Sequence, residues 1–356
     1  MKQTCILILG MHRSGTSALS GTLNLLDVYL GSDLMKPHKE VNSKGFYENT
    51  LLYKVNKKLL KQIGSSWDDA FYSESKLNSE VDTTELEKVL KQEFQYSQLF
   101  AIKDPRLAYL FPLYTKALTN LGIEIKVVIP FRNPLEVADS LRTRNQFSQE
   151  KGLLLWAYHF LLSEEQSRDY PRVFTRFDEL LQTPQNVIKL MDKRFDLDLA
   201  SKFVAKEEQV LDFLTPGLKH HNIALDNLSE KMPKIIQDIV GLVPMLNEKD
   251  LTIQFDELRT QLFDYQALFY NADITTSLQE LEQAKQGLQA KDNELEQAKQ
   301  GLQAKDNELE QAKQRLQAKD NDLEQIKHEL ISMYLSKSWK MTRPLRQSKR
   351  IFRLKK

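Results

Sequence analysis

The sequence predicts an α/β fold, in which a parallel sheet is flanked by helices, followed by a long C-terminal coiled-coil helix. Three observations support this prediction. Short apolar runs without polar alternation take turns with longer helical segments over the first 270 residues, which is typical of parallel sheets. A glycine-bracketed turn joins the first apolar run to a helical segment. Leucine recurs every seven residues near the C-terminus, as in coiled coils.

The strands and helices of the α/β part can be assigned from these patterns. The predicted strands are Cys5–Leu9, Phe100–Ile102, Ile125–Pro130 and Val173–Phe174. The predicted helices are Thr16–Leu30, Leu135–Arg144, Lys151–Glu165 and Pro184–Lys193. Ligands of such sheets bind beyond the carboxyl ends of the strands, so we expect the functional residues there.

A 14-residue repeat defines the C-terminal part of the chain. Residues 281–294 recur identically at 295–308, and leucines spaced by seven run from Leu281 to Leu330. The second seam position alternates Ala with Lys, and glycines weaken the helix, so a lone fraying helix is the alternative to a coiled coil. We expect three parts: an α/β domain at 1–270, a coiled-coil repeat at 276–333 that could form a homo-oligomer, and a basic tail at 334–356.

Charge is divided unevenly along the chain. Of the 50 Lys and Arg, nine lie in residues 336–356, which leaves 41 against 49 Asp and Glu, or about −8, in residues 1–335. An acidic body argues against nucleic-acid binding. The basic tail could contact a membrane surface, or it could simply be solvated. Cys5 is the only cysteine, and no apolar run approaches the ~20 residues of a membrane span. We expect a cytoplasmic protein that the tail could hold at the inner membrane surface.

The first candidate motif follows the first predicted strand. Gly10 and Gly15 bracket four residues in the sequence GMHRSGTS, and a helix should begin at once. Such a turn aims backbone N–H groups at an anion, and its spacing is that of a P-loop, which makes the sheet P-loop-type. Thr16 replaces the usual lysine and the cation is Arg13, so we expect phosphate binding without lysine-and-magnesium chemistry. The alternative is a plain glycine turn between a strand and a helix.

The second candidate motif follows the third predicted strand. Arg132 stands at its carboxyl end, Pro134 suits the first turn of the next helix, and Ser140 lies about two turns further on. An arginine at this point can hold a phosphate with its fork of donors. A P-loop ATPase would carry an acidic residue near the end of such a strand for Mg²⁺, whereas Pro and Arg stand here, so we expect no metal site.

Together the two motifs resemble those of the sulfotransferases that use PAPS (3′-phosphoadenosine 5′-phosphosulfate), and in particular of bacterial members. Gly10–Leu23 is similar to that family's loop for the 5′-phosphosulfate, and Arg132–Ser140 to its 3′-phosphate motif. Lys103–Arg106 is similar to a Lys-Asp-Pro segment of the protein-tyrosine and heparan branches, and Phe174–Pro184 to a later bacterial segment. The resemblance covers roughly residues 1–220. It implies transfer of a sulfuryl group from PAPS to an acceptor hydroxyl without a metal.

The resemblance also implies individual roles. The implied donor-binding residues are His12, Arg13, Ser14, Gly15, Thr16, Ser17, Arg132 and Ser140. Arg13 would also steady the oxygen that leaves, and Lys103 would help the transfer. Because the attacking hydroxyl must lose a proton, a general base is needed. Glu48, in the segment GFYEN, is the first candidate and His38 the second; a carboxylate at a helix start is the other explanation for Glu48.

The acceptor is not evident from the α/β part. Residues 336–346 (SKSWKMTRPLR) resemble a tail found after coiled coils in bacterial glycan-assembly proteins, which implies a glycan or glycolipid as partner. Two other functions stay open. One is a P-loop kinase-like phosphotransferase, against which the missing lysine and the missing strand-end acid weigh. The other is a coiled-coil scaffold whose α/β domain is catalytically inactive.

Overall fold

The structure is a computed structural model that describes residues 3–36, 45–69, 77, 81–215, 232–269, 272–342 and 344–346. The chain divides into two compact units, Met1–Tyr270 and Asn271–Lys356.

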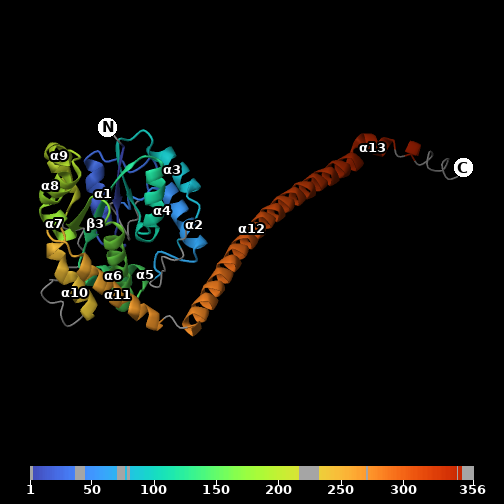
Figure 1. The fold of residues 1–356 in the computed structure, drawn as a ribbon. Helices are drawn as coiled ribbons and strands as arrows, with labels where there is room; N and C mark the ends of the chain where they lie inside the picture. The colour runs from blue at the N-terminus through green and yellow to red at the C-terminus, as the bar shows by residue number, and fades with distance from the viewer. Residues whose placement is uncertain are drawn as a thin grey trace. The chain divides into compact units, whose positions relative to one another are not determined.

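The first unit contains a four-stranded parallel sheet in the order β2-β1-β3-β4. The strands are β1 (Thr4–Ile8), β2 (Leu99–Lys103), β3 (Glu124–Phe131) and β4 (Arg172–Arg176). In the register of the sheet Cys5 lies between Phe100 and Ile125. The predicted α/β fold with a parallel sheet and flanking helices is therefore confirmed (Figure 1). The carboxyl ends of β1 and β3 are neighbours, which brings the segments that follow them to one edge.

Helices cover both faces of the sheet. They are α1 (Thr16–Leu25), α2 (Thr50–Gln62), α3 (Thr84–Phe94), α4 (Leu107–Asn120), α5 (Pro134–Asn145), α6 (Gln149–Gln166), α7 (Phe177–Gln182), α8 (Pro184–Phe195), α9 (Leu199–Phe213), α10 (Lys234–Leu242), the 3₁₀ turn η4 (Val243–Met245) and α11 (Thr252–Phe269). Figure 1 shows α1, α7, α8 and α9 on one side and α2, α3 and α4 on the other. Side chains of β1 alternate between the two apolar layers: Cys5 and Leu7 enter one, Ile6 and Ile8 the other.

The first helix is shorter than the sequence predicts. The apolar spacing favours a helix from Thr16 to Leu30, whereas α1 ends at Leu25. Asp27 takes a positive φ of 62°, and the N–H of Val28 donates to the carbonyl of Leu23 at 3.0 Å, which is the geometry of a Schellman ending. The later apolar residues are buried all the same, because the chain turns back along the edge of β2.

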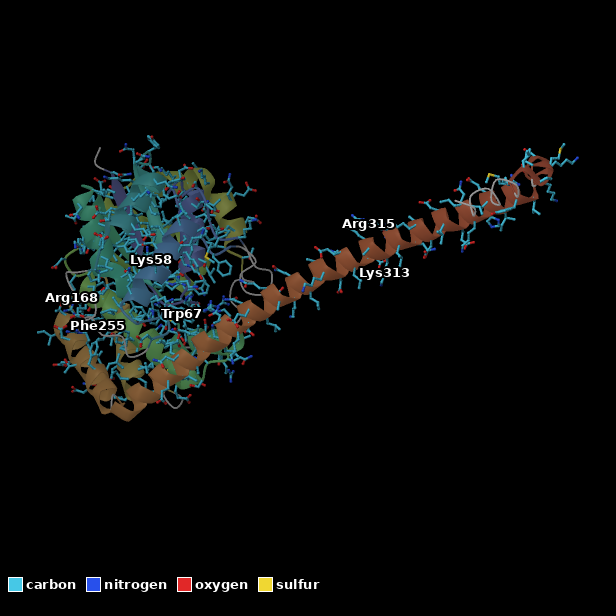
Figure 2. All side chains as sticks on the ribbon, turned by 90° about the vertical axis from the view of Figure 1, so that its right-hand side faces the viewer. Lys58, Trp67, Arg168, Phe255, Lys313 and Arg315 are labelled. Atoms are coloured by element: carbon cyan, nitrogen blue, oxygen red, sulfur yellow. The ribbon has the colours of Figure 1, made fainter. Side chains whose placement is uncertain are left out.

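The second unit is dominated by one helix, α12 (Ala272–Leu335), of 64 residues, followed by the short α13 (Lys337–Met341). Its heptad leucines, Leu281 to Leu330, are between 48% and 64% exposed in the single chain, so their apolar surface lies open to solvent. Side chains stand out along α12, Lys313 and Arg315 among them (Figure 2). Pairing with a partner helix and contact of the basic tail with a membrane stay predictions. No helix in the described part of the chain combines the length and apolarity needed to cross a bilayer.

Gly15 is the glycine on which the loop before α1 depends. Its φ is +89°, and a Cβ built there would lie 2.5 Å from Cδ2 of Phe177. An alanine at this position would therefore meet both backbone strain and a clash with an aromatic ring. Gly122 has a similar φ of +70°, but no described atom lies within 4 Å of a Cβ built there.

This pair of glycines gives a matched test of the loop. We predict that Gly122→Ala lowers the free energy of unfolding by about 1 kcal/mol, from backbone strain alone. Gly15→Ala should lower it by about 3 kcal/mol, because the clash with Phe177 adds to the same strain. Urea unfolding followed by near-ultraviolet circular dichroism measures both. Equal losses in the two variants would show that the loop relaxes without cost.

Candidate active site

The loop between β1 and α1 is held in a conformation that few residues adopt. Arg13 has a positive φ of 71°, and Gly15, the residue before the helix, is also left-handed. The N–H of Ser14 closes a turn by donating to the carbonyl of Met11 at 3.2 Å. A non-glycine residue at positive φ costs of order 1 kcal/mol and persists only where its surroundings impose it. The Arg13 side chain is therefore placed by the fold, and its contacts show where.

Arg13 reaches the second motif directly. Its Nε donates to Oγ of Ser140 at 2.6 Å, across 127 positions of sequence. In return, Nη1 of Arg132 donates to the main-chain carbonyl of Arg13 at 3.1 Å. The two sequence motifs therefore form one site, because β1 and β3 are adjacent and both segments leave the sheet at the same edge.

Arg132 is a buried cation held by several contacts. It is only 6% exposed, its Nε donates to Oε2 of Glu136 at 2.9 Å, and its guanidinium carbon lies 4.6 Å from the centre of the Phe177 ring. Its second amino nitrogen, Nη2, is buried and has no hydrogen-bond partner in the described part of the chain. A buried guanidinium that keeps one donor unsatisfied is suited to an anion.

A second buried donor also lacks a hydrogen-bond partner. Oγ of Ser14, in the loop, is buried and finds no partner among the residues that the structure describes. A hydroxyl left unsatisfied away from water costs about 1–3 kcal/mol. Ser14 and Arg132 therefore offer two donors to a ligand that can accept hydrogen bonds.

Helix α5 places the side chains of the second motif on one face. Oδ1 of Asn133 accepts from the N–H of Leu135 at 3.0 Å and so caps the helix. Glu136, Ser140 and Arg144 then follow at intervals of four residues, which puts them in one row. In this row Glu136 accepts a hydrogen bond from Arg132, and Ser140 accepts one from Arg13.

Lys103 and Glu48 form a buried ion pair at the end of β2. Nζ of Lys103 donates to Oε1 of Glu48 at 2.6 Å and to the carbonyl of Phe46 at 3.1 Å. Both side chains are at most 5% exposed. The Phe46 carbonyl also accepts from Oγ of Ser17 at 3.4 Å, so the segment with Glu48 is tied to the start of α1. Glu48 is therefore an inward-facing carboxylate with a cation beside it, rather than a solvated charge at the start of α2.

His12 and Arg13 lie in a strongly positive environment. Burial, and then the charges of Arg144 and Lys103, lower the pKa of His12 well below its usual value. Its imidazole is therefore neutral at pH 7, and brings one donor but no charge. Burial, followed by Arg144 and Arg132, lowers the pKa of Arg13 to about 10, which still leaves the guanidinium charged at pH 7.

The residues of the third predicted motif, Lys103–Arg106, have two different roles. Lys103 faces Glu48, whereas Asp104 turns into the core. Asp104 accepts from Nη1 of Arg106 at 2.8 Å and from Nδ2 of Asn56 at 3.0 Å. This network fixes the end of β2 against α2 and α4.

The structure brings together most of the residues that the sequence predicts for the site. Gly15, Thr16 and Ser17 form the turn into α1 beside the others, while His38 lies outside the described residues. Sequence reasoning did not single out Glu136, Arg144 or Trp67, which also belong to this edge. The four-residue spacing from Glu136 to Arg144 was the signal that could have found two of them. Among the described residues no group of three or more His, Cys, Asp or Glu is placed to hold a metal ion.

Comparison with known proteins gives similarities to two kinds of protein. One similar solved structure is the sulfotransferase domain of the Synechococcus PCC 7002 olefin synthase, with 12% identity over 73% of this chain and 95% of that one and a TM-score of 0.38. A second is the sulfotransferase domain of the curacin biosynthetic pathway, with 14% identity over 74% of this chain and 98% of that one and a TM-score of 0.33. A third is the sulfotransferase STF1 of Mycobacterium tuberculosis H37Rv, with 12% identity over 60% of this chain and 77% of that one and a TM-score of 0.31. Likeness at this level establishes no shared activity, so the site's own residues must carry any functional conclusion.

The other similarity concerns only the second unit. The domain family described as the C-terminal domain of protein involved in starch initiation 1 matches residues 275–340, which lie in and just beyond α12. It neither confirms a coiled coil nor bears on the α/β unit. No curated protein sequence matches the chain.

The pair of Arg132 and Glu136 can be tested through stability. Glu136→Gln leaves the Arg132 guanidinium buried without its countercharge, so we predict a loss of about 3 kcal/mol in the free energy of unfolding. The control is Asp139→Asn on the same helix, which breaks the pair with the exposed Arg142 and should cost less than about 1 kcal/mol. Urea unfolding compares them; equal losses would mean that Arg132 is solvated.

Proposed function

We propose that the α/β unit moves a sulfuryl group from PAPS to a hydroxyl of an acceptor. One observation carries the proposal: Arg13, Ser140 and Arg132 meet at the ends of β1 and β3, next to two buried donors without partners. PAPS carries phosphate groups on the 3′ and 5′ positions of its ribose. Their oxygens can accept hydrogen bonds from the two segments that follow β1 and β3. No metal is needed to bind it, because the site supplies its own cations.

The residues present fit the donor. Ser14, with the N–H groups of Gly15, Thr16 and Ser17 at the start of α1, would hold the 5′-phosphosulfate, as a helix N-terminus favours an anion. Nη2 of Arg132 and the hydroxyl of Ser140 would hold the 3′-phosphate. His12, being neutral, would contribute a hydrogen bond at most.

The transfer itself asks for charge stabilisation and for a place for one proton. PAPS supplies the activated sulfuryl group; the acceptor oxygen bonds to its sulfur as the bond from sulfur to the phosphate oxygen breaks. Arg13 belongs to the loop and would stabilise the negative charge that gathers on that leaving oxygen. Such reactions depend chiefly on positioning and on electrostatic stabilisation.

Glu48 is the residue that we propose as the general base. Its carboxylate would take the proton of the acceptor hydroxyl, and Lys103, hydrogen-bonded to it at 2.6 Å, fixes the orientation of that carboxylate. Lys103 would thus act through Glu48. Because both are buried beside the start of α1, the proton would be taken up close to the bound donor. His38 stays the alternative base.

The acceptor class that we propose is a glycan or a glycolipid. This part of the proposal rests on the likeness of the tail to those of glycan-assembly proteins. Transfer of labelled sulfate from PAPS to a panel of glycans tests it, and labelling of peptides or nucleic acids alone would contradict it.

Two buried serines give a sharp test of donor binding. Ser14 and Ser163 both carry a buried hydroxyl that has no partner in the described part of the chain, but Ser163 lies on α6 rather than in the loop. We predict that Ser14→Ala weakens binding of PAP, the desulfated donor, about tenfold or more, since a hydrogen bond to a charged group is lost. Ser163→Ala should leave PAP binding unchanged. Isothermal titration of the full chain measures both.

The free protein provides the internal control. Removing an unsatisfied hydroxyl leaves stability unchanged or raises it, so neither serine variant should unfold more easily. Wild-type protein that fails to bind PAP would overturn the proposed function. Equal effects of the two substitutions would remove Ser14 from the site.

The proposed base is tested by kinetics. We predict that Glu48→Gln lowers kcat at least about 100-fold, because the hydroxyl keeps its proton, while the Kd for PAP changes by less than about threefold. A fall in PAP affinity as large as the fall in kcat would make Glu48 a donor-binding residue instead.

A further inference from the structure

Arg144 is a cation of this edge to which the proposed function gives no role. It lies on α5, one turn beyond Ser140 and on the same face, and it is partly buried. Its Nε donates to Oδ1 of the neighbouring Asn145 at 2.6 Å. The remaining guanidinium donors make no hydrogen bond or ion pair to any residue that the structure describes.

Three buried cations around Arg144 have a carboxylate partner, whereas no described carboxylate forms an ion pair with Arg144. Each of the three has its carboxylate within 2.9 Å: Lys103 with Glu48, Arg106 with Asp104, and Arg132 with Glu136. A partly buried guanidinium without such a partner is unfavourable for the folded protein. Its presence next to a reaction site is explained if a ligand supplies the negative charge.

Aromatic packing holds the guanidinium of Arg144 in place. Its central carbon lies 5.5 Å from the centre of the Trp67 ring. Trp67 in turn stacks on Phe147, with ring centres 5.7 Å apart, and meets the ring of His12 edge-on at 4.4 Å. His12 belongs to the loop before α1, so Arg144 is anchored through Trp67 to the proposed donor site. A guanidinium fixed in this way loses little entropy when it binds a planar anion.

The charge of Arg144 acts on groups in both parts of the proposed site. Its charge lowers the pKa of Arg13 and that of His12. Its own pKa is lowered by burial and partly restored by the charge of Glu48. Arg144 therefore lies close enough to interact with both Arg13, at the loop, and Glu48, where the acceptor hydroxyl would lose its proton.

We propose that Arg144, held by Trp67, binds a monoanionic group of the acceptor, a carboxylate or a sulfate ester, close to the hydroxyl that receives the sulfuryl group. This inference rests on the proposed function and names the acceptor class: an acidic rather than a neutral glycan. The two terminal nitrogens of the Arg144 guanidinium can donate to the oxygens of one such monoanionic group. Phosphate dianions call for more donors, and this chain gathers those around Arg13 and Arg132 instead.

The test uses the full chain saturated with PAP and small probes of defined charge. D-glucuronate and D-glucose 6-sulfate carry the two monoanionic groups, and D-glucose is the neutral control. Ligand-observed nuclear magnetic resonance titration gives the Kd of each. We expect at least one of the two charged sugars to bind, and we expect D-glucose not to bind. Arg144→Gln should weaken that binding about tenfold or more.

Control variants separate this subsite from its surroundings. Arg142→Gln, on the same helix but exposed and paired with Asp139, should leave the Kd of the charged sugars unchanged. Arg144→Lys should recover part of the binding, because the charge is kept without the fork. The Kd for PAP should change by less than about threefold in all three variants, which also shows that they are folded.

Each failure has its own meaning. If the wild type binds PAP but binds the charged sugars no better than glucose, the inference about Arg144 is overturned and the proposed function stands. The same holds if Arg144→Gln weakens PAP as much as it weakens the sugars, since Arg144 would then serve the donor. If the wild type does not bind PAP, the proposed function itself is overturned, and this inference with it.

Discussion

The fixed position of Arg132 is the constraint on which the rest of this site depends. Its Nε donates to Glu136, its Nη1 donates to the carbonyl of Arg13, and Phe177 lies against its face. Its Nη2 has no acceptor in the described part of the chain. Phe177 also lies against Gly15, where a Cβ would clash. The ring of Phe177 therefore contacts both the loop before α1 and Arg132, and so helps to hold the two motifs next to each other.

The site is built at the expense of stability. Arg13 is held at positive φ, Ser14 and Arg132 keep unsatisfied donors, and a buried pair, Lys103 with Glu48, takes two charges out of water. Each of these costs free energy in the free protein. An anionic ligand bound at this edge of the sheet would accept from the two donors of Ser14 and Arg132 and so offset part of that cost.

Much of this arrangement could be predicted from sequence, for physical reasons. Uninterrupted apolar runs such as Cys5–Leu9 indicate buried parallel strands, and the residues after β1 and β3 had to meet at an edge. The end of α1 was missed because Leu26 and Leu30 keep a helical spacing while Asp27 breaks the helix through its backbone. The stacking of Arg144 on Trp67 joins residues that no local pattern relates, and only the folded chain reveals it.

The most direct measurement of the central claim is a crystal structure of the α/β unit with PAP bound. The account predicts one phosphate on the loop, accepting from Oγ of Ser14, and the other accepting from Nη2 of Arg132 and from the hydroxyl of Ser140. Both donors that lack partners in the described part of the free chain would then be satisfied. Nucleotide found elsewhere, or bound with Ser14 and Arg132 still without acceptors, would contradict the account.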